Sequence, residues 1–317
     1  MNKHAKIFVA GHKGLVGSAI VRRLQSLGYD NFLLRSRTQL DLCEQTAVRD
    51  FFARERPEYV FLAAAKVGGI VANNTWPAEF IYENLAIQTN VIHNAWQSDV
   101  KRLLFLGSSC IYPKFAPQPM REEHLLTGEL EPTNEPYAVA KIAGIKMCQA
   151  YNRQYGTNFL SVMPTNLYGP NDNFDLTSSH VIPALMRKVY EAKINGSSTV
   201  EIWGTGTPRR EFLYVDDMAD ACVFIMEAPQ AKLDVNDAYF WNVGTGIDVT
   251  IAKLAQSICN VIGFQGELVF NTDKPDGAPR KLLDVGRLNA IGWTSSIDLQ
   301  RGLNDTYRWF VQDNIAH

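Results

Sequence analysis

The sequence predicts an α/β fold: a doubly wound parallel sheet joined to a smaller mixed α/β lobe. Residues 7–10 form a short apolar strand that runs into a glycine-rich turn and then a helix. Strand-like and helical segments then alternate as far as residue 163, which is typical of a parallel sheet covered by helices. After residue 169 the alternation loosens. We therefore expect residues 1–170 to form the main domain, with returning segments near 212–245, and residues 171–317 to form mainly the smaller lobe.

Composition narrows the class of protein. Of 317 residues, 46% are hydrophobic and 20% are charged, an ordinary globular balance. A net charge of −2 disfavours binding to nucleic acid or to a membrane surface. Five cysteines without paired spacing predict free thiols rather than disulfides or a metal site. No apolar run approaches the roughly 20 residues of a membrane span, and no signal peptide is visible, so we expect a cytoplasmic protein.

The first turn predicts dinucleotide binding. Glycines let the backbone approach a pyrophosphate, and the N-terminus of the following helix, expected over residues 18–27, offers unpaired N–H groups to it. Together with a second strand this pattern favours a Rossmann-type domain over a merely tight strand–helix connection. The turn residues expected to contact the cofactor are Gly11, Lys13, Gly14, Leu15, Val16 and Gly17.

The end of the second strand, residues 31–35, indicates which dinucleotide binds. An NAD-binding protein usually carries an acidic residue there, whereas this chain has Arg35 and Arg37. Guanidinium groups match the geometry of a 2′-phosphate, and Lys13 adds a third positive charge nearby. We therefore predict NADP(H); the alternative is that both arginines are solvated surface charges.

The remaining elements follow in order. Helices are expected over 44–55, 77–98 and 137–155, and strands over 59–65, 103–106 and 159–163. The third strand ends in small residues, including Ala63 and Ala65, that let a cofactor pass close. Residues 113–136 form a loop whose length is typical of a functional segment. Beyond it we expect helices ending at 192 and 227, strands over 200–204, 240–244 and 267–270, and a basic turn over 276–281.

Polar groups converge where the fourth strand ends. That strand runs into Ser108, Ser109 and Cys110, and the next helix carries Tyr137 and Lys141, four residues apart and on one face. A phenol has a reference pKa of about 10, which a neighbouring ammonium lowers, so Tyr137 can exchange a proton with an oxygen at which hydride transfer occurs. Ser108 would hold the same oxygen. The alternative is an amphipathic helix with a buried tyrosine and an exposed lysine.

The glycine turn, Ser108 with Tyr137 and Lys141, and residues 164–170 resemble the extended short-chain dehydrogenases/reductases that act on nucleotide sugars. The resemblance implies that Tyr137 is the acid–base group, that Lys141 binds the nicotinamide ribose and that Ser108 steadies the substrate oxygen. It also implies cofactor contacts from residues outside the turn. These are Asp41, Leu42, Pro164, Asn166, Leu167 and His180.

The thiol of Cys110 narrows the set of reactions that the site can catalyse. Sugar 4,6-dehydratases of this family carry an acidic pair where this chain has Ser109 and Cys110. A thiol has a reference pKa of about 8.5, so in a positive environment it can take a proton alpha to a ketone. Residues 107–113 and 180–185 resemble the family's epimerase/reductases of GDP-linked 4-keto sugars. The resemblance implies epimerisation of carbons 3 and 5 of GDP-4-keto-6-deoxy-D-mannose, with Cys110 as base and His180 as acid, followed by NADPH reduction of carbon 4 with Tyr137 as proton donor.

The alternative for Cys110 is a small buried hydrophobe, which free cysteine often is. We assign structural roles to the other cysteines, which are Cys43, Cys148, Cys222 and Cys259.

The resemblance also implies a substrate site in the smaller lobe. Trp203 would stack on guanine, Lys188, Arg210 and Lys281 would neutralise the diphosphate, and Asp276 would bind base or ribose groups. Ser109 and Asn166 would face the sugar. A homodimer through a four-helix bundle, supplied by residues 77–98 and 137–155, is implied as well. Two alternatives stay open: another NADP-dependent 4-keto nucleotide-sugar epimerase or reductase, and a non-catalytic NADP-sensing protein.

Overall fold

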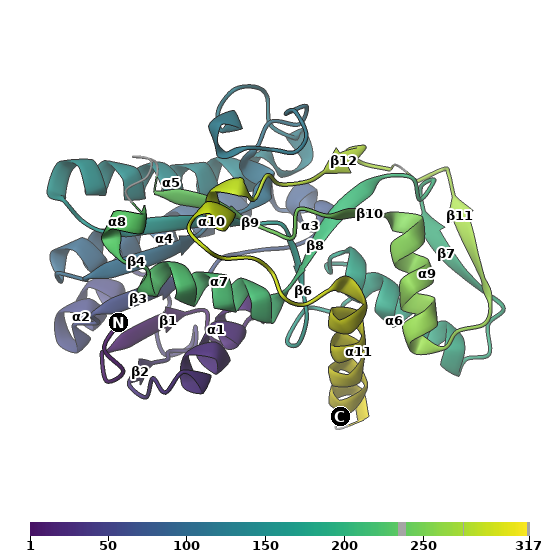
Figure 1. Ribbon diagram of the computed structural model, residues 1–317, viewed down its shortest axis with the longest axis horizontal. Helices are drawn as coiled ribbons and strands as arrows, with labels where there is room; N and C mark the ends of the chain where they lie inside the picture. The colour runs from purple at the N-terminus through teal and green to yellow at the C-terminus, as the bar shows by residue number, and fades with distance from the viewer. Residues whose placement is uncertain (234–238, 275, 316–317) are drawn as a thin grey trace.

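A parallel six-stranded sheet forms the centre of the larger domain in the computed structural model, which describes residues 1–233, 239–274 and 276–315 (Figure 1). Its strand order is β2-β1-β3-β4-β5-β9. The strands are β1 Ile7–Ala10, β2 Phe32–Leu33, β3 Tyr59–Leu62, β4 Arg102–Leu106, β5 Phe159–Pro164 and β9 Phe240–Val243. Each neighbouring pair is parallel, so the predicted fold class is confirmed.

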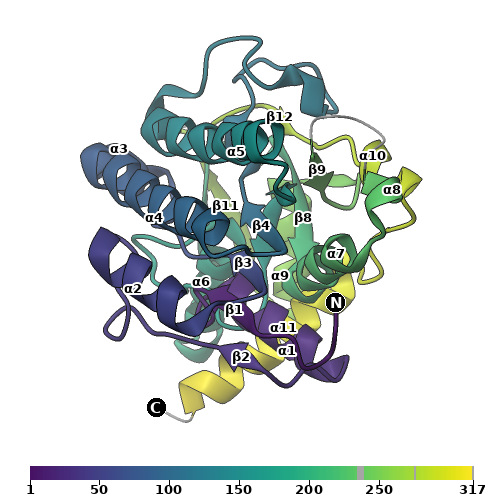
Figure 2. The same cartoon turned by 90° about the vertical axis from the view of Figure 1, so that its left-hand side faces the viewer.

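Helices cover both faces of this sheet (Figure 2). One face carries α1 Leu15–Ser26 and α7 Val215–Glu227, and the other carries α2 Gln45–Glu55, α4 Pro77–Gln97 and α5 Glu135–Tyr155. Successive side chains of a strand point to opposite faces. Accordingly Ile7 and Val9 pack in one buried cluster, and Phe8 and Ala10 pack in the other. Because both faces are buried, the strands read as continuous apolar runs.

The smaller lobe lies beside the carboxyl ends of these strands (Figure 1). In its mixed sheet, β8 Arg209–Tyr214 pairs with β6 Asn166–Tyr168, β10 Asp248–Thr250 and β12 Arg280–Lys281. A second sheet joins β7 Thr199–Trp203 to β11 Glu267–Asn271. Helices α6 Val181–Ile194, α9 Ile251–Ile262 and α11 Leu299–Ile315 pack against them around a third apolar core. Short helices α3 Ile70–Thr75, α8 Gln230–Leu233 and α10 Gly286–Ala290 complete the described elements.

Several elements differ from the sequence-based expectation. The first helix begins at Leu15 rather than at residue 18, because Gly14 already serves as its N-cap. The second strand is shorter than expected, and helix α3 was not predicted. Strand β6 and helices α9 and α11 were not predicted. The basic turn contributes β12, and the loop over 113–136 contains the 3-10 turns Glu122–His124 and Pro132–Asn134.

No helix in the described parts of the chain is long and apolar enough to cross a bilayer.

Candidate active site

Strand β4 delivers Cys110 through a short capped turn. Gly107 follows the strand where an added Cβ would lie 2.9 Å from the sulfur of Met163, so a side chain would not fit there. The Ser108 hydroxyl oxygen then accepts a hydrogen bond from the Cys110 amide at 3.2 Å and caps the 3-10 turn Ser109–Ile111. Ser109 is buried, whereas Cys110 is partly accessible. The turn therefore displays the thiol at the carboxyl edge of the sheet.

Helix α5 packs closely enough on β4 to bring Tyr137 to this turn. A Cβ at Gly144 would lie 2.4 Å from the ring of Phe105, so only glycine allows this approach. The Gln88 amide of α4 also holds α5, by donating to the Ala140 carbonyl at 2.6 Å. As a result the Tyr137 hydroxyl forms a hydrogen bond with the Ser108 side chain.

Lys141 lies beneath this pair. Its ammonium donates to the Leu106 carbonyl at 2.8 Å and lies 5.8 Å from the centre of the Tyr137 ring. Burial lowers the pKa of Lys141 to about 7. Burial also raises the pKa of Tyr137, as does the neighbouring charge of Cys110, while the bond with Ser108 acts in the opposite direction. We expected the ammonium to lower the pKa of Tyr137, but burial of the phenol outweighs any such effect.

A cation from the smaller lobe reaches the thiol. The Lys281 ammonium of β12 lies 3.6 Å from the Cys110 sulfur. His180 precedes α6 as its N-cap residue, and burial and the charge of Lys281 together lower its pKa. His180 is nevertheless exposed in surface area, so neighbouring protein atoms crowd it without enclosing it. Thus the structure gathers Ser108, Cys110, Tyr137, His180 and Lys281 around one point.

The glycine turn fits a bound pyrophosphate. Gly11 has φ +84°, and a Cβ there would lie 2.8 Å from the Ala64 nitrogen. A Cβ at Gly17 would lie 2.1 Å from the Gly11 oxygen, so α1 packs directly on the turn. No side chain caps the N-terminus of α1, and no acidic residue lies in its first turn. Exposed Gly14 thus leaves room and free N–H groups for an anion.

The two candidate 2′-phosphate ligands have carboxylate partners. Arg35 lies 3.4 Å from Glu55, and Arg37 lies 3.4 Å from Asp41 and 3.3 Å from Glu83. Both arginines follow β2, beside the glycine turn in the sheet order.

The other predicted cofactor residues lie in the glycine turn, in α1, at or after the ends of strands, and in the loop before α2. Lys13 is exposed in the turn, and Leu15 and Val16 begin α1. Ala63 and Ala65 follow β3, Pro164 ends β5, and Asn166 and Leu167 lie in β6. The Asn166 amide already donates to the Glu211 carbonyl at 2.8 Å. Asp41 accepts from the Cys43 amide at 2.9 Å, and the Leu42 carbonyl accepts from Asn90.

A second group of predicted residues gathers in the smaller lobe. The Lys188 ammonium lies 5.2 Å from the centre of the half-exposed Trp203 ring. Asp276 accepts from the Thr205 amide at 2.7 Å, and its charge acts on Arg210. Lys281 is instead directed at Cys110. Four of the five predicted guanosine-diphosphate ligands thus share one side of the lobe, and the fifth lies at the thiol.

Sequence reasoning missed two charged residues. Lys274 places its ammonium 5.4 Å from the centre of the Trp203 ring, and Glu211 is fully buried between the two lobes. Glu211 follows two arginines in β8, a run of charges that is typical of an exposed surface. Nothing in the local sequence pattern indicates that Glu211 is buried.

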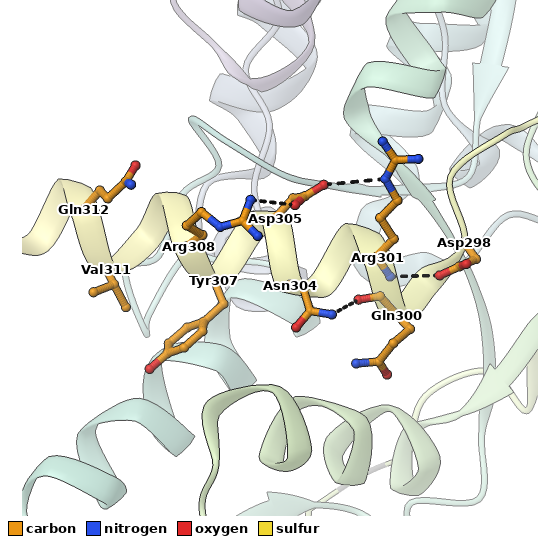
Figure 3. A pocket seen from close by; sticks show the side chains of 9 residues that line it. All are labelled: Asp298, Gln300, Arg301, Asn304, Asp305, Tyr307, Arg308, Val311 and Gln312. Carbon is orange, nitrogen blue, oxygen red and sulfur yellow. Dashed lines mark hydrogen bonds and ion pairs between the residues drawn. The ribbon is translucent and has the colours of Figure 1, made fainter.

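An open groove of about 830 Å³ follows one side of α11 (Figure 3). Its lining residues run from Asp298 to Gln312 and include none of the predicted site residues. Its polar groups bond to one another: Arg308 pairs with Asp305 at 3.1 Å, and the Asn304 amide donates to the Gln300 carbonyl. The groove is therefore separate from the residues gathered around Cys110.

Comparison with known proteins shows the family to which this chain is similar. Residues 7–244 match the NAD dependent epimerase/dehydratase family. The chain is 60% identical to a putative GDP-L-fucose synthase 2 of Arabidopsis thaliana, covering 99% of this chain and 94% of the relative. It is 58% identical to a GDP-L-fucose synthase of Escherichia coli K12, covering 97% of each. It also resembles the solved structure of a GDP-mannoheptose C4 reductase from Campylobacter jejuni with NADP bound, with a TM-score of 0.90, 43% identity and coverage of 98% and 99%.

Proposed function

The chain belongs to the NAD dependent epimerase/dehydratase family, and we infer that it acts as an NADPH-dependent GDP-L-fucose synthase, converting GDP-4-keto-6-deoxy-D-mannose to GDP-L-fucose. The names of the highly identical relatives support the substrate. The observation that carries the chemistry is the thiol of Cys110 beside Ser108 and Tyr137, because a reductase alone needs no base at that position.

We propose that the larger domain holds the cofactor. The glycine turn and the N-terminus of α1 would bind the pyrophosphate, and Arg35 and Arg37 would bind the 2′-phosphate in exchange for their present carboxylate partners. Lys141 would hold the nicotinamide ribose from beneath Tyr137. When bound, NADPH supplies the hydride that reduces carbon 4.

The epimerisation stage would come first. The Cys110 thiolate takes the proton from carbon 3 or carbon 5, and the electron pair of that C–H bond moves toward the carbon-4 carbonyl oxygen. Ser108 and Tyr137 donate hydrogen bonds to this oxygen as it gains negative charge. Protonated His180 returns a proton on the opposite face, which inverts the carbon. The lowered pKa of His180 makes its protonated form a stronger acid, and this form is more populated at acidic than at neutral pH.

Reduction would use the same oxygen. As carbon 4 accepts the hydride, the Tyr137 hydroxyl gives its proton to the oxygen and a hydroxyl group forms. The raised pKa of Tyr137 keeps the phenol protonated before this step. One pocket therefore serves both stages, because the same oxygen gathers negative charge in each.

The smaller lobe would bind the GDP portion of the substrate. Trp203 would stack on guanine beside Lys188, and Arg210 and Asp276 would bind the diphosphate and the ribose or base. Residues 1–170 with returning segments near 212–245 would form one domain, and 171–317 mainly the other. Strand β9 and helix α7, which join the larger sheet and its face, support the returning segments.

We also propose a cytoplasmic homodimer. Helices α4 and α5 pack side by side on one face of the sheet (Figure 2). They leave Tyr82, Val139 and Tyr155 exposed on the protein surface. Two such pairs of helices, one from each protomer, would form a four-helix bundle that buries these side chains.

A second candidate is a reductase of a different GDP-linked 4-keto sugar. The 43% identity to the Campylobacter jejuni C4 reductase favours it, since that protein shares this chain's length and fold. Such an enzyme would reduce a 4-keto sugar without exchanging protons at carbons 3 and 5.

One experiment separates these activities. The protein is incubated with GDP-4-keto-6-deoxy-D-mannose and NADPH in deuterated water, and both absorbance loss and deuterium at carbons 3 and 5 are followed. We expect NADPH oxidation with deuterium at both carbons, and loss of the deuterium in Cys110→Ser. Absence of NADPH oxidation would refute the proposed function. Oxidation without deuterium at either carbon would favour the second candidate.

A further inference from the structure

Lys281 is the cation nearest the thiol among the contacts of the described residues. Its ammonium lies 3.6 Å from the Cys110 sulfur, although the two residues are 171 positions apart in the chain. An opposite charge at such a distance stabilises a thiolate relative to a thiol. The other ionisable groups near this point are Tyr137 and Lys141 from α5 and His180 before α6. Burial lowers the pKa of Lys141 to about 7 and also lowers that of His180, so neither is a permanent cation.

The backbone on either side of Lys281 is held from two directions. On one side, the Leu282 amide donates to the Gln118 side chain at 2.9 Å, and the Leu282 carbonyl accepts from the Met120 amide at 2.8 Å. The Asp284 amide donates to the Met120 carbonyl at 2.8 Å. These hydrogen bonds join the loop over 113–136 to the segment that carries Lys281. They therefore fix the position of the Lys281 backbone.

Glu211 holds the segment from the other side. It is fully buried, and its Oε2 accepts from the Leu283 amide at 2.9 Å. Its Oε1 accepts from the amides of Thr245 and Gly246, each at 2.7 Å. Within the described ranges no lysine or arginine pairs with this carboxylate. A buried carboxylate without a cation is costly, so its three backbone donors are what stabilise it here.

We propose that Glu211 is a positioning residue that fixes Lys281 against Cys110, and that the Lys281 ammonium stabilises the Cys110 thiolate during epimerisation. The proposal rests on the proposed function for the identity of the reaction. In that reaction the C–H bond alpha to the ketone breaks, its proton forms an S–H bond, and its electron pair enters the enolate. The ammonium then stands beside a neutral thiol, which returns to the thiolate by losing its proton to solvent.

The charge coupling can be measured without substrate. Alkylation of Cys110 by iodoacetamide is followed by mass spectrometry from pH 5 to 10 in wild type, Lys281→Met and Lys281→Arg. We expect the pH midpoint of alkylation to rise by at least about one unit in Lys281→Met, and Lys281→Arg to stay near wild type. Cys43, also partly accessible and distant in the fold, is the internal control whose labelling stays unchanged. An unchanged midpoint in Lys281→Met overturns the proposal.

The positioning role has its own variant. Glu211→Gln keeps the shape and one acceptor oxygen, and we expect its alkylation midpoint to move in the same direction as that of Lys281→Met. If Glu211→Gln does not fold, Glu211→Asp, which keeps the charge and shortens the reach to the Leu283 amide, is measured in its place. A wild-type midpoint in the folded variant refutes the positioning role.

Activity then separates this inference from the proposed function. We expect Lys281→Met to lower the rate of deuterium entry at carbons 3 and 5 by at least about tenfold, and Lys281→Arg to restore most of it. A shifted alkylation midpoint in a protein that does not oxidise NADPH with GDP-4-keto-6-deoxy-D-mannose would refute the proposed function and leave the coupling standing. A raised KM for the substrate with unchanged alkylation would assign Lys281 to the diphosphate and refute the inference.

Discussion

Single buried charges show where this fold gives up stability for its chemistry. Lys141 is only 3% exposed and has no carboxylate partner among the ion pairs of the described residues. Its one hydrogen bond goes to the neutral carbonyl of Leu106. An isolated ammonium in such a place is unfavourable, which is why burial lowers the pKa of Lys141 to about 7.

The sign of the resulting pH dependence follows from linkage. An unfolded lysine has a pKa of about 10.4, so between about pH 7 and 10 the unfolded chain binds more protons and the free energy of unfolding rises with pH. Below about pH 7 both states are protonated, and the folded state bears the full cost of the buried ammonium. Lys141→Met removes this cost, together with a hydrogen bond of about 1 kcal/mol.

We therefore predict that Lys141→Met is more stable than wild type at pH 6, by on the order of a few kcal/mol, and that this advantage shrinks toward pH 10. The same variant loses carbon-4 reduction. Urea unfolding at several pH values measures the first effect, and NADPH oxidation measures the second. A stability difference that does not change with pH would contradict the assignment of the cost to the ammonium.

The arginines after β2 give a second residue-scale prediction. In Arg35→Ala with Arg37→Ala, we expect the preference for NADPH over NADH to fall by at least about tenfold, because a hydrogen bond to a charged group contributes about 1.5–3 kcal/mol. Arg49→Ala, which removes an exposed arginine paired only with Asp50, is the matched control and keeps the wild-type preference. The ratio of kcat/KM values measures it, and an equal ratio in the double variant would exclude the arginines from the 2′-phosphate site.

At the scale of elements, the glycine turn contains glycines that are needed for two different reasons. Gly17 is required by internal packing, since a Cβ there would overlap the Gly11 oxygen at 2.1 Å. Gly14 is exposed, and a Cβ there would meet that oxygen only at 3.5 Å, an ordinary contact. Internal packing therefore does not require a glycine at position 14. The missing side chain instead leaves space for a ligand that approaches the turn from solvent.

We predict different phenotypes for these two glycines. Gly17→Ala lowers the melting temperature of the cofactor-free protein by several degrees, because the shift of α1 costs about 1–3 kcal/mol. Gly14→Ala keeps the melting temperature and weakens NADPH binding by about tenfold or more. Thermal unfolding without cofactor and fluorescence titration with NADPH measure the two effects. Equal melting temperatures for both variants would contradict the packing argument.

Elements were predictable where local signals exist. The alternation of strands and helices correctly predicted the parallel sheet as far as β5. Helix α9 was missed although Thr250 caps it by accepting from the Lys253 amide and Gly263 ends it at φ +75°, both recognisable signals. Strand β6 carries no such signal: it has three residues and exists only because β8 pairs with it. Short strands of this kind depend on tertiary contacts that no local pattern encodes.

The candidate site also contains contacts that were predictable from the sequence and contacts that were not. Ser108, Cys110, Tyr137 and Lys141 lie close in sequence and follow one strand and one helix, so their convergence was predictable. The approach of Lys281 to Cys110 was not, because it depends on how β12 pairs with β8 in the mixed sheet.

At the scale of the whole molecule, the two lobes meet in buried hydrogen bonds. The Asn242 side chain of β9 donates to the carbonyls of Met120 and Asp284 and accepts from the Tyr112 hydroxyl at 2.5 Å. Buried Glu122 accepts from the Asn242 amide at 2.9 Å. These bonds tie the loop over 113–136 and the segment after β12 to the edge of the larger sheet. The contact lies at the β9 end of the strand order, opposite to β2. On α4 and α5, Tyr82, Val139 and Tyr155 stay exposed.

That free surface leads to a prediction about assembly. Val139 on α5 and Tyr82 on α4 are 40% and 66% exposed, and apolar side chains on neighbouring helices are typical of an interface. We expect wild type to sediment at twice the chain mass of 35.6 kDa. In Val139→Glu we expect the dissociation constant of the dimer to rise by at least about tenfold, because an unpaired carboxylate buried in a bundle is unfavourable. Ile247→Glu, at a 71% exposed site in the smaller lobe, is the matched control and stays dimeric. Sedimentation of wild type at a single chain mass over micromolar concentrations would refute the dimer, and dissociation of Ile247→Glu would move the interface to the smaller lobe.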